Sequence, residues 1–205
     1  MSKQKGVTLI ELLIVIVVLG IIASFSIPAS AQLIRNVKVG KIFNELVVIE
    51  TGARYYFYDV GERPRGSLSG AGTCATWNAD SIEVFIEGER DGIPIEGWSG
   101  PYMNDWDDET PLGGCYVYRN YEVGSQNWAR SNWYRFIDDV QLDNIAPTNK
   151  DIELIMIRFY PLNDQATIDK ALEVAEQLLG KVPEEQLFYV DGQAVIGYYI
   201  LPQTD

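Results

Sequence analysis

The sequence predicts an α+β fold: a long N-terminal helix packed on an antiparallel sheet head, with a C-terminal strand–helix–hairpin unit. An apolar run from Val7 to Ile27 continues, without a loop signal, into an amphipathic stretch that ends at Tyr58. The alternating tyrosines of Cys115–Arg119 and the β-branched residues of Ile152–Phe159 predict strands. With 205 residues, 47% of them hydrophobic, the chain is long enough for one membrane helix and one globular head.

The first part of the predicted helix, residues 7–27, is suited to a membrane. Its 21 residues are enough to span a bilayer. Glu11 is the one ionisable side chain within this run. A carboxylate in that setting costs about 2.5–3.5 kcal/mol on insertion scales, so it calls for a partner that removes the cost.

The second part of the helix, residues 28–58, is expected to be its amphipathic continuation, with one face against the head. Pro28 removes a backbone donor and is expected to kink or locally melt the helix. Apolar residues that recur at helical spacing define the expected buried face: Ile34, Val37, Ile42, Leu46, Ile49, Ala53 and Phe57. The aromatic run Tyr55–Tyr58, where the helix meets the head, is expected to serve packing.

The polar leader, residues 1–6, suggests the partner of Glu11. It contains two lysines and ends at Gly6. A cut after Gly6 would make Val7 a new amino terminus, four positions from Glu11. In a bundle of such helices, the amine of one chain can meet the carboxylate of its neighbour, so that each charge offsets the desolvation of the other.

The segment from Gly6 to Ile16, together with Gly20 and Pro28, resembles the amino terminus of type IV pilins and type II secretion pseudopilins. Val7 stands where that family usually has phenylalanine. The resemblance implies cleavage between Gly6 and Val7 by a prepilin peptidase and N-methylation of Val7. It also implies polymerisation through the helix, with assembly residues Val7, Thr8, Glu11, Gly20 and Pro28.

The same resemblance implies a set of partners and a location. The partners are copies of the chain, other pilin-like subunits and an inner-membrane assembly platform. The lysines before the apolar run orient the chain with its amino terminus in the cytoplasm and its head in the periplasm. From there the subunit would pass into a pilus or a pseudopilus, and so to the cell surface in the case of a pilus.

A different interpretation treats the same segment as a secretory signal peptide. Lys3 and Lys5 would form its basic region, and Ala29-Ser30-Ala31 would be the cleavage site. The product would be a secreted or membrane-anchored binding protein, for example a glycan-binding one. The 21-residue apolar run is long for a signal core, and the helical pattern continues past Ala31, which favours the filament interpretation.

The remainder of the chain divides into a head, residues 59–150, and the C-terminal strand–helix–hairpin part, residues 151–205. Glycines between Gly61 and Gly72 mark the exit from the long helix. Asn163 or Asp164 is expected to cap a helix that Gly180 ends. Asp191-Gly192 predicts a type I′ hairpin between Leu187–Val190 and Ala194–Ile200.

Cys74 and Cys115 are the two cysteines of the chain. In an exported head we expect them to form a disulfide.

The segment Gly97–Tyr102 and the turn Pro111–Gly114 before the tyrosine-rich strand also resemble the middle of major pseudopilins and some pilins. In some pseudopilins this loop binds calcium. Carboxylate oxygens are ligands that calcium prefers, and the candidate ligands here are Asp105, Asp107 and Asp108. The competing interpretation is a solvated acidic turn, because runs of charged residues are commonly exposed.

Composition argues against several classes of function. The formal net charge of −13 is unsuited to non-specific nucleic-acid binding, which needs clustered cations. The chain has no histidine, which excludes imidazole-based triads and histidine metal sites. It also lacks a nucleophile elbow and a phosphate-cradling glycine loop. We therefore expect a structural protein without a catalytic site.

Overall fold

The computed structural model describes residues 7–64, 82–90, 92–106, 109–121, 133–142 and 152–200, except the side chains at 25–29 and 121. The chain forms two compact units, Met1–Lys38 and Val39–Asp205. The second is called the head unit below.

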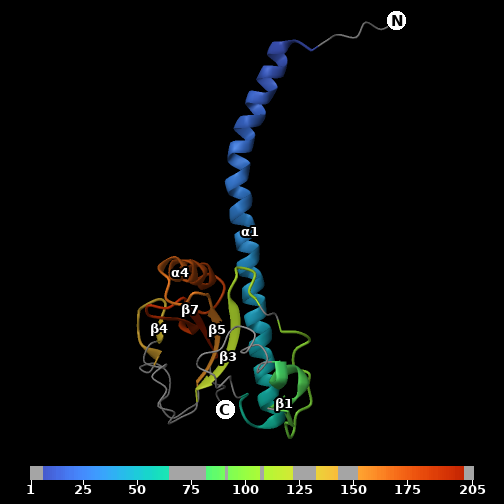
Figure 1. Cartoon of the computed structure of the whole chain (residues 1–205), viewed down its shortest axis with the longest axis vertical. Coiled ribbons are helices and arrows are strands. Elements are labelled where there is room, and N and C mark those ends of the chain that lie inside the picture. The colour runs from blue at the N-terminus through green and yellow to red at the C-terminus, as the bar shows by residue number, and fades with distance from the viewer. Residues whose placement is uncertain are drawn as a thin grey trace, which may run out of the picture. The chain divides into compact units, whose positions relative to one another are not determined.

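Helix α1 spans Leu9–Val60, a total of 52 residues, and its backbone is helical across Pro28 (Figure 1). Gly61 ends it with a φ of +79°, and the Gly61 amide donates to the Phe57 carbonyl at 2.9 Å. The left-handed conformation that follows the last turn of a helix favours glycine. This requirement explains Gly61, one of the glycines that marked the helix exit. In the described part of the chain, no helix meets the length and apolarity that crossing a membrane requires.

The head unit contains a five-stranded sheet in which every neighbouring pair is antiparallel. Its order is β3-β5-β7-β6-β4. The strands are β3 (Cys115–Tyr121), β4 (Trp133–Arg135), β5 (Ile152–Arg158), β6 (Leu187–Val190) and β7 (Val195–Ile200). The predicted C-terminal unit therefore adds strands to this sheet and does not form a separate lobe.

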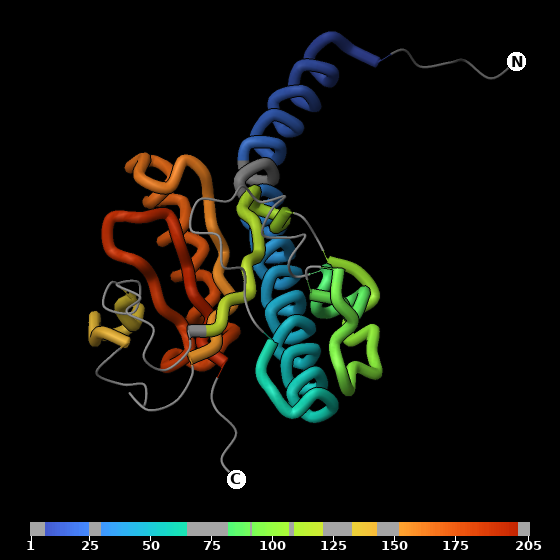
Figure 2. Tube along the Cα trace, turned by 60° about the horizontal axis from the view of Figure 1, so that its bottom comes forward, coloured from blue at the N-terminus to red at the C-terminus, as the bar shows by residue number. Residues whose placement is uncertain are grey.

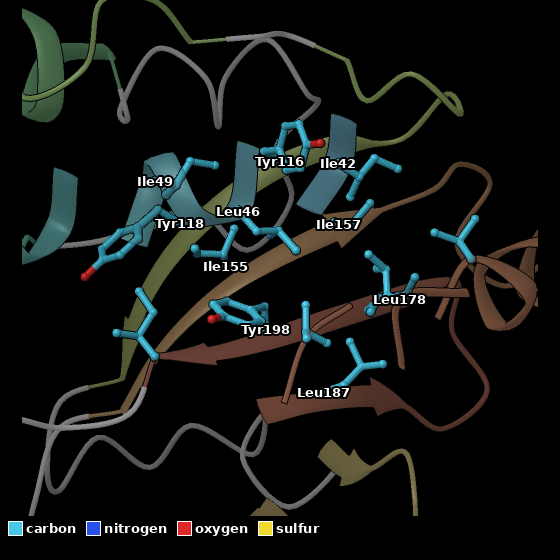
Figure 3. Packing of buried hydrophobic residues seen from close by; sticks show 14 of the residues in the cluster. Ile42, Leu46, Ile49, Tyr116, Tyr118, Ile155, Ile157, Leu178, Leu187 and Tyr198 are labelled. Atoms are coloured by element: carbon cyan, nitrogen blue, oxygen red, sulfur yellow. The ribbon is translucent and has the colours of Figure 1, made fainter. Parts of the chain in front are cut away.

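Each face of the sheet contributes to a hydrophobic cluster. On one face, Tyr116, Ile157 and Tyr198 pack with α1 residues such as Leu46 and with Leu178 of α4 (Gln165–Leu179) (Figure 3). The residues that alternate with them, Val117, Leu154 and Met156 among others, belong to a second cluster with Trp133. The period of two along each strand thus places both faces of the sheet in a core, and Tyr116 and Tyr118 share the helix-covered face as predicted.

The remaining elements are short. The π-helix η1 spans Glu83–Glu87, and β1 (Glu89–Arg90) pairs with β2 (Ile93–Pro94) as a small hairpin, green in Figure 2. The 3₁₀ helix η3 (Glu184–Gln186) leads into β6. Asp164 caps α4 by accepting a hydrogen bond from the Thr167 amide at 3.0 Å, one of the two predicted alternatives.

The buried face of α1 differs from the prediction at both of its ends. Ile34 and Val37 are 58% and 65% exposed, and Phe57 is 37% exposed. The buried positions at alternating spacings of three and four are Val39, Ile42, Leu46, Ile49, Ala53 and Tyr56. The predicted face departs from these positions at Ile34, Val37 and Phe57, because apolar residues occur on both sides of the helix and spacing alone did not show which side is buried. Of the aromatic run, only Tyr56 is buried in the core, whereas Tyr55, Phe57 and Tyr58 are exposed.

The hairpin at Asp191-Gly192 is not a type I′ turn. That turn needs positive φ at both central residues, whereas Gly192 has a φ of +68° and Asp191 is not in the left-handed region. The strands end at Val190 and restart at Val195, so the loop contains four residues. The Gln193 amide donates to the Val190 carbonyl at 3.2 Å and closes this longer loop.

Candidate functional site

The N-terminal end of α1 carries a reciprocal cap formed by Thr8 and Glu11. The Thr8 amide and hydroxyl both donate to Glu11 Oε2, each at 2.8 Å. The Glu11 amide donates to Thr8 Oγ1 at 3.3 Å. This is a capping box, which satisfies free donors at the helix start and places a negative charge at the positive end of the helix dipole.

The cap gives Glu11 partners within its own chain. The predicted pairing considered only the amine of a neighbouring chain, and it overlooked Thr8 as a donor. The Thr-x-x-Glu spacing before an apolar run is a known signature of a helix start, so the sequence could have revealed it. Val7 lies outside the helix and is 74% exposed, and Gly6 lies outside the described residues.

The turns after the cap present apolar side chains on every side of the helix. The large apolar residues of Leu9–Ile22, called the apolar sleeve below, are between 46% exposed (Val18) and 84% exposed (Leu9). A helix that is apolar all round is normally buried in a protein core or in lipid. A contiguous apolar surface of this extent marks an interaction site.

Two other predicted assembly residues lie on the same helix. A Cβ added at Gly20 would meet no atom within 4 Å, so nothing within the chain requires glycine there. Pro28 lies within α1, and its side chain is outside the described set.

The segment Gly97–Tyr102 packs against η1. The Trp98 indole N–H donates to the Val84 carbonyl at 3.1 Å, and the Tyr102 amide donates to the Phe85 carbonyl at 2.9 Å. A Cβ at Gly88, where φ is +75°, would lie 2.6 Å from the Trp98 ring. Only glycine fits there, so the tryptophan is a structural anchor of the head.

Of the residues predicted to form a disulfide or to bind calcium, the structure describes Cys115 and Asp105. Cys115 is fully buried at the start of β3 and is disulfide-bonded. Cys74 lies outside the described residues, so its pairing with Cys115 stays a prediction. Asp107 and Asp108 lie outside them too, while Asp105 Oδ1 accepts from the Trp106 amide at 2.9 Å. No group of three potential metal ligands occurs among the residues that the structure describes, and calcium binding at Asp105, Asp107 and Asp108 stays a prediction.

Three buried tyrosines of the sheet donate hydrogen bonds to carboxylates, and these links were not predicted. Tyr116 donates to Glu45 and Tyr198 donates to Glu50 at 2.7 Å, so both link the sheet to α1. Burial, followed by the adjacent Glu50 carboxylate, raises the pKa of the Tyr198 hydroxyl. The third tyrosine, Tyr118, donates to Glu153, which is 4% exposed on β5.

Each of these carboxylates also pairs with a cation. Lys41 Nζ lies 3.0 Å from Glu45, and the Arg54 guanidinium lies 2.6 Å from Glu50. Arg63, just beyond the end of α1, pairs with Glu153. Phenol and cation together satisfy each partly or fully buried charge, as a buried carboxylate requires. The arrangement fixes the second half of α1 on the sheet of the head unit.

Comparison with known proteins finds a family motif at the N-terminal end of the chain, where the capping box lies. Residues 1–27 match a family described as the prokaryotic N-terminal methylation motif. The chain is 36% identical over 83 residues to fimbrial protein EcpC of Eikenella corrodens, covering 40% of this chain and 54% of that protein. It is 28% identical over 108 residues to the type II secretion system core protein G of Klebsiella pneumoniae, covering 50% and 75%.

A fimbrial protein of Pseudomonas aeruginosa is 27% identical over 118 residues, covering 47% of this chain and 77% of that protein. The chain spans about half of the length of the Eikenella protein, the relative with 36% identity. No solved structure matches the chain. The motif and the relatives confirm the resemblance to type IV pilins and type II secretion pseudopilins.

Proposed function

We propose that this chain, which carries the methylation motif of pilins and pseudopilins, is a structural subunit of a type IV pilus or a type II secretion-type pseudopilus. The observation that carries the proposal is the apolar sleeve, which is exposed on all sides and begins with one capped carboxylate. A surface of that kind needs lipid or other copies of the same helix around it.

The geometry at the helix start suits processing by a prepilin peptidase between Gly6 and Val7. Because the capping box starts the helix at Leu9, Val7 stays outside the hydrogen-bonded turns and accessible. Cleavage would free the Val7 amine for methylation. The motif matched at residues 1–27 supports this step.

Before assembly, residues 7–27 would lie in the inner membrane, with the amino terminus in the cytoplasm and the head in the periplasm. The Thr8 donors would hold the Glu11 carboxylate during this stage, which lowers the cost of a charge next to lipid. In the polymer, the amine of Val7 on a neighbouring copy would be the second partner of that carboxylate. Pairing of the two charges would then select the register between helices, since lipid gives no hydrophobic driving force that could favour one apolar register over another.

The proposed partners are other copies of this chain, further pilin-like subunits, the peptidase and an inner-membrane assembly platform. Gly20 and Pro28 are proposed to adapt the helix for packing in the filament. The head contributes the outer surface, stabilised by a Cys74–Cys115 disulfide that an oxidising compartment would form. No catalytic role is proposed for any residue.

The decisive experiment combines mass spectrometry of the mature amino terminus with one substitution. N-methylated Val7 is expected, whereas a terminus at Gln32 would support the secreted-binding-protein alternative and an intact Met1 a plain membrane anchor. Glu11→Leu should leave membrane fractionation unchanged and abolish filaments, because the register-setting charge is gone. Leu12→Ile at the adjacent position is the matched control and should form filaments. Normal filaments from Glu11→Leu would contradict the pairing.

A further inference from the structure

Charge is segregated along the chain in a way that the Glu11 pairing does not explain. Between Glu11 and Glu45 the sequence has no acidic residue and three cations, Arg35, Lys38 and Lys41. From residue 45 onward it has 28 acidic and 11 basic residues. One part of α1 is therefore positive in a protein whose head is strongly negative.

The positive part of α1 is also apolar and exposed. Residues 33–38, called the basic segment below, include Leu33, Ile34 and Val37, which are 64%, 58% and 65% exposed. Arg35 and Lys38 lie three positions apart, so they project from neighbouring positions on the helix surface. Exposed apolar side chains next to cations favour a partner surface that is apolar with an acidic rim.

The head unit has a surface pocket of that kind, with a volume of about 200 Å³. Its apolar wall includes Met103 and Trp106, which are 7% and 4% exposed, and its outer side includes Val48 at 50%. Carboxylates of Glu45 and Asp105 also line it. Glu45 is engaged by Lys41 and Tyr116, whereas Asp105 is exposed and uses Oδ1 for its own loop.

We infer that the basic segment of one copy docks in this pocket on the head unit of a second copy, with Lys38 at Asp105. The inference rests on the proposed function, because it assigns one contact between subunits of the polymer. The aliphatic stem of a lysine can lie along Met103 and Trp106 while its ammonium stays at the rim. Opposite charges on the two surfaces favour this register over others.

The contact is heterologous, since the helix of one copy meets the head of another. Heterologous contacts that do not close into a ring generate open helical filaments. A contact of this type is therefore consistent with growth of a polymer, and it lies outside the apolar sleeve and the Glu11 pair.

Carbodiimide cross-linking of purified filaments tests the contact on native residues. The reagent joins a lysine amine to a nearby carboxylate as an amide, with loss of water. Mass spectrometry of the digest should find a Lys38–Asp105 link. The Lys41–Glu45 pair, whose atoms lie 3.0 Å apart within one copy, is the internal positive control.

A pair of variants shows whether the link joins two copies. Filaments of Lys38→Arg alone, or of Asp105→Asn alone, should lack the Lys38–Asp105 link because each lacks one reactive group. Co-expression of the two variants should restore it, since Lys38 of one copy can then react with Asp105 of the other. Failure to restore it would overturn the inference, as would wild-type filaments that show only the Lys41–Glu45 link.

Charge reversal gives a second, independent measurement. Lys38→Glu should lower filament yield about tenfold, a change that corresponds to loss of a close charge pair. Asp105→Lys in the same chain should recover most of that yield, and the thermal melt of Lys38→Glu should match the wild type. A loss that Asp105→Lys does not recover would assign Lys38 to another partner, such as phospholipid headgroups, and would overturn the inference. If the wild type forms no filament, the proposed function fails as well.

Discussion

Arg63→Leu tests how far the buried carboxylate of Glu153 depends on its cation. Glu153 is 4% exposed in β5, where it accepts from the Tyr118 hydroxyl and pairs with Arg63. Removal of one partner from a buried ion pair costs about 3–5 kcal/mol, because the remaining charge is left uncompensated. Arg63 is 23% exposed, so water can partly replace it, and we expect the lower end, about 3 kcal/mol.

The expected change in melting temperature follows from the size of the head unit. Val39–Asp205 contains 167 residues, and a domain of that size shifts by about 2–4 °C per kcal/mol. The full-length chain in detergent at neutral pH should therefore melt about 6–12 °C lower, as followed by circular dichroism. Arg135→Leu is the control, because its partner Asp138 is 39% exposed and the loss of a surface pair should change the melt little.

A second variant removes the Glu153 charge that Arg63→Leu leaves without its cation. Glu153→Gln in the Arg63→Leu background should recover more than half of the lost stability, since the amide can still hydrogen-bond Tyr118 without carrying a charge. The reasoning is refuted if Arg63→Leu melts within about 2 °C of the wild type, or if the double variant is no more stable than the single one.

Three further predictions concern other contacts. Gly197→Ala should destabilise the head by about 1–3 kcal/mol in thermal melts, because the new methyl would lie 2.5 Å from the Trp133 ring; Gly180→Ala, with no atom within 4 Å, is the control. Tyr198→Phe should cost about 1 kcal/mol at pH 7 through loss of the bond to Glu50. Because the folded pKa of Tyr198 lies above its ordinary value of 10.0, wild-type stability should fall as pH rises beyond that value, and the fall should be smaller in the variant. Thr8→Val should speed amide hydrogen exchange in the first turn of α1, whereas Thr8→Ser, which keeps the hydroxyl, should not.

The long helix, several strand locations and the N-terminal motif could be predicted because their signals are local. Periodicity alone indicated α1, and residue type and spacing indicated β3, β5 and α4. The helix face was predicted less well, since Val37 and Val39 are equally apolar and only the sheet decides which is buried. A hairpin was expected correctly at Asp191-Gly192, but its loop length depends on where the strands stop pairing.

The tyrosine–carboxylate links could not be predicted from the sequence because they depend on tertiary contacts. Tyr116 and Glu45 are 71 positions apart, and Tyr198 and Glu50 are 148 apart. No local pattern brings such residues together. The capping box is different, because Thr8 and Glu11 are three positions apart and their signature was readable in the sequence.

The position of β7 has a consequence for how the protein is made. Among the described strands it is the last in the chain, yet it lies between β5 and β6, and all six of its residues are buried. Because β7 leaves the ribosome after the other described strands, the five-stranded sheet cannot be completed before residue 200 has been synthesised. A truncation at residue 194 would therefore remove the central strand of the sheet and leave β5 and β6 without their shared neighbour.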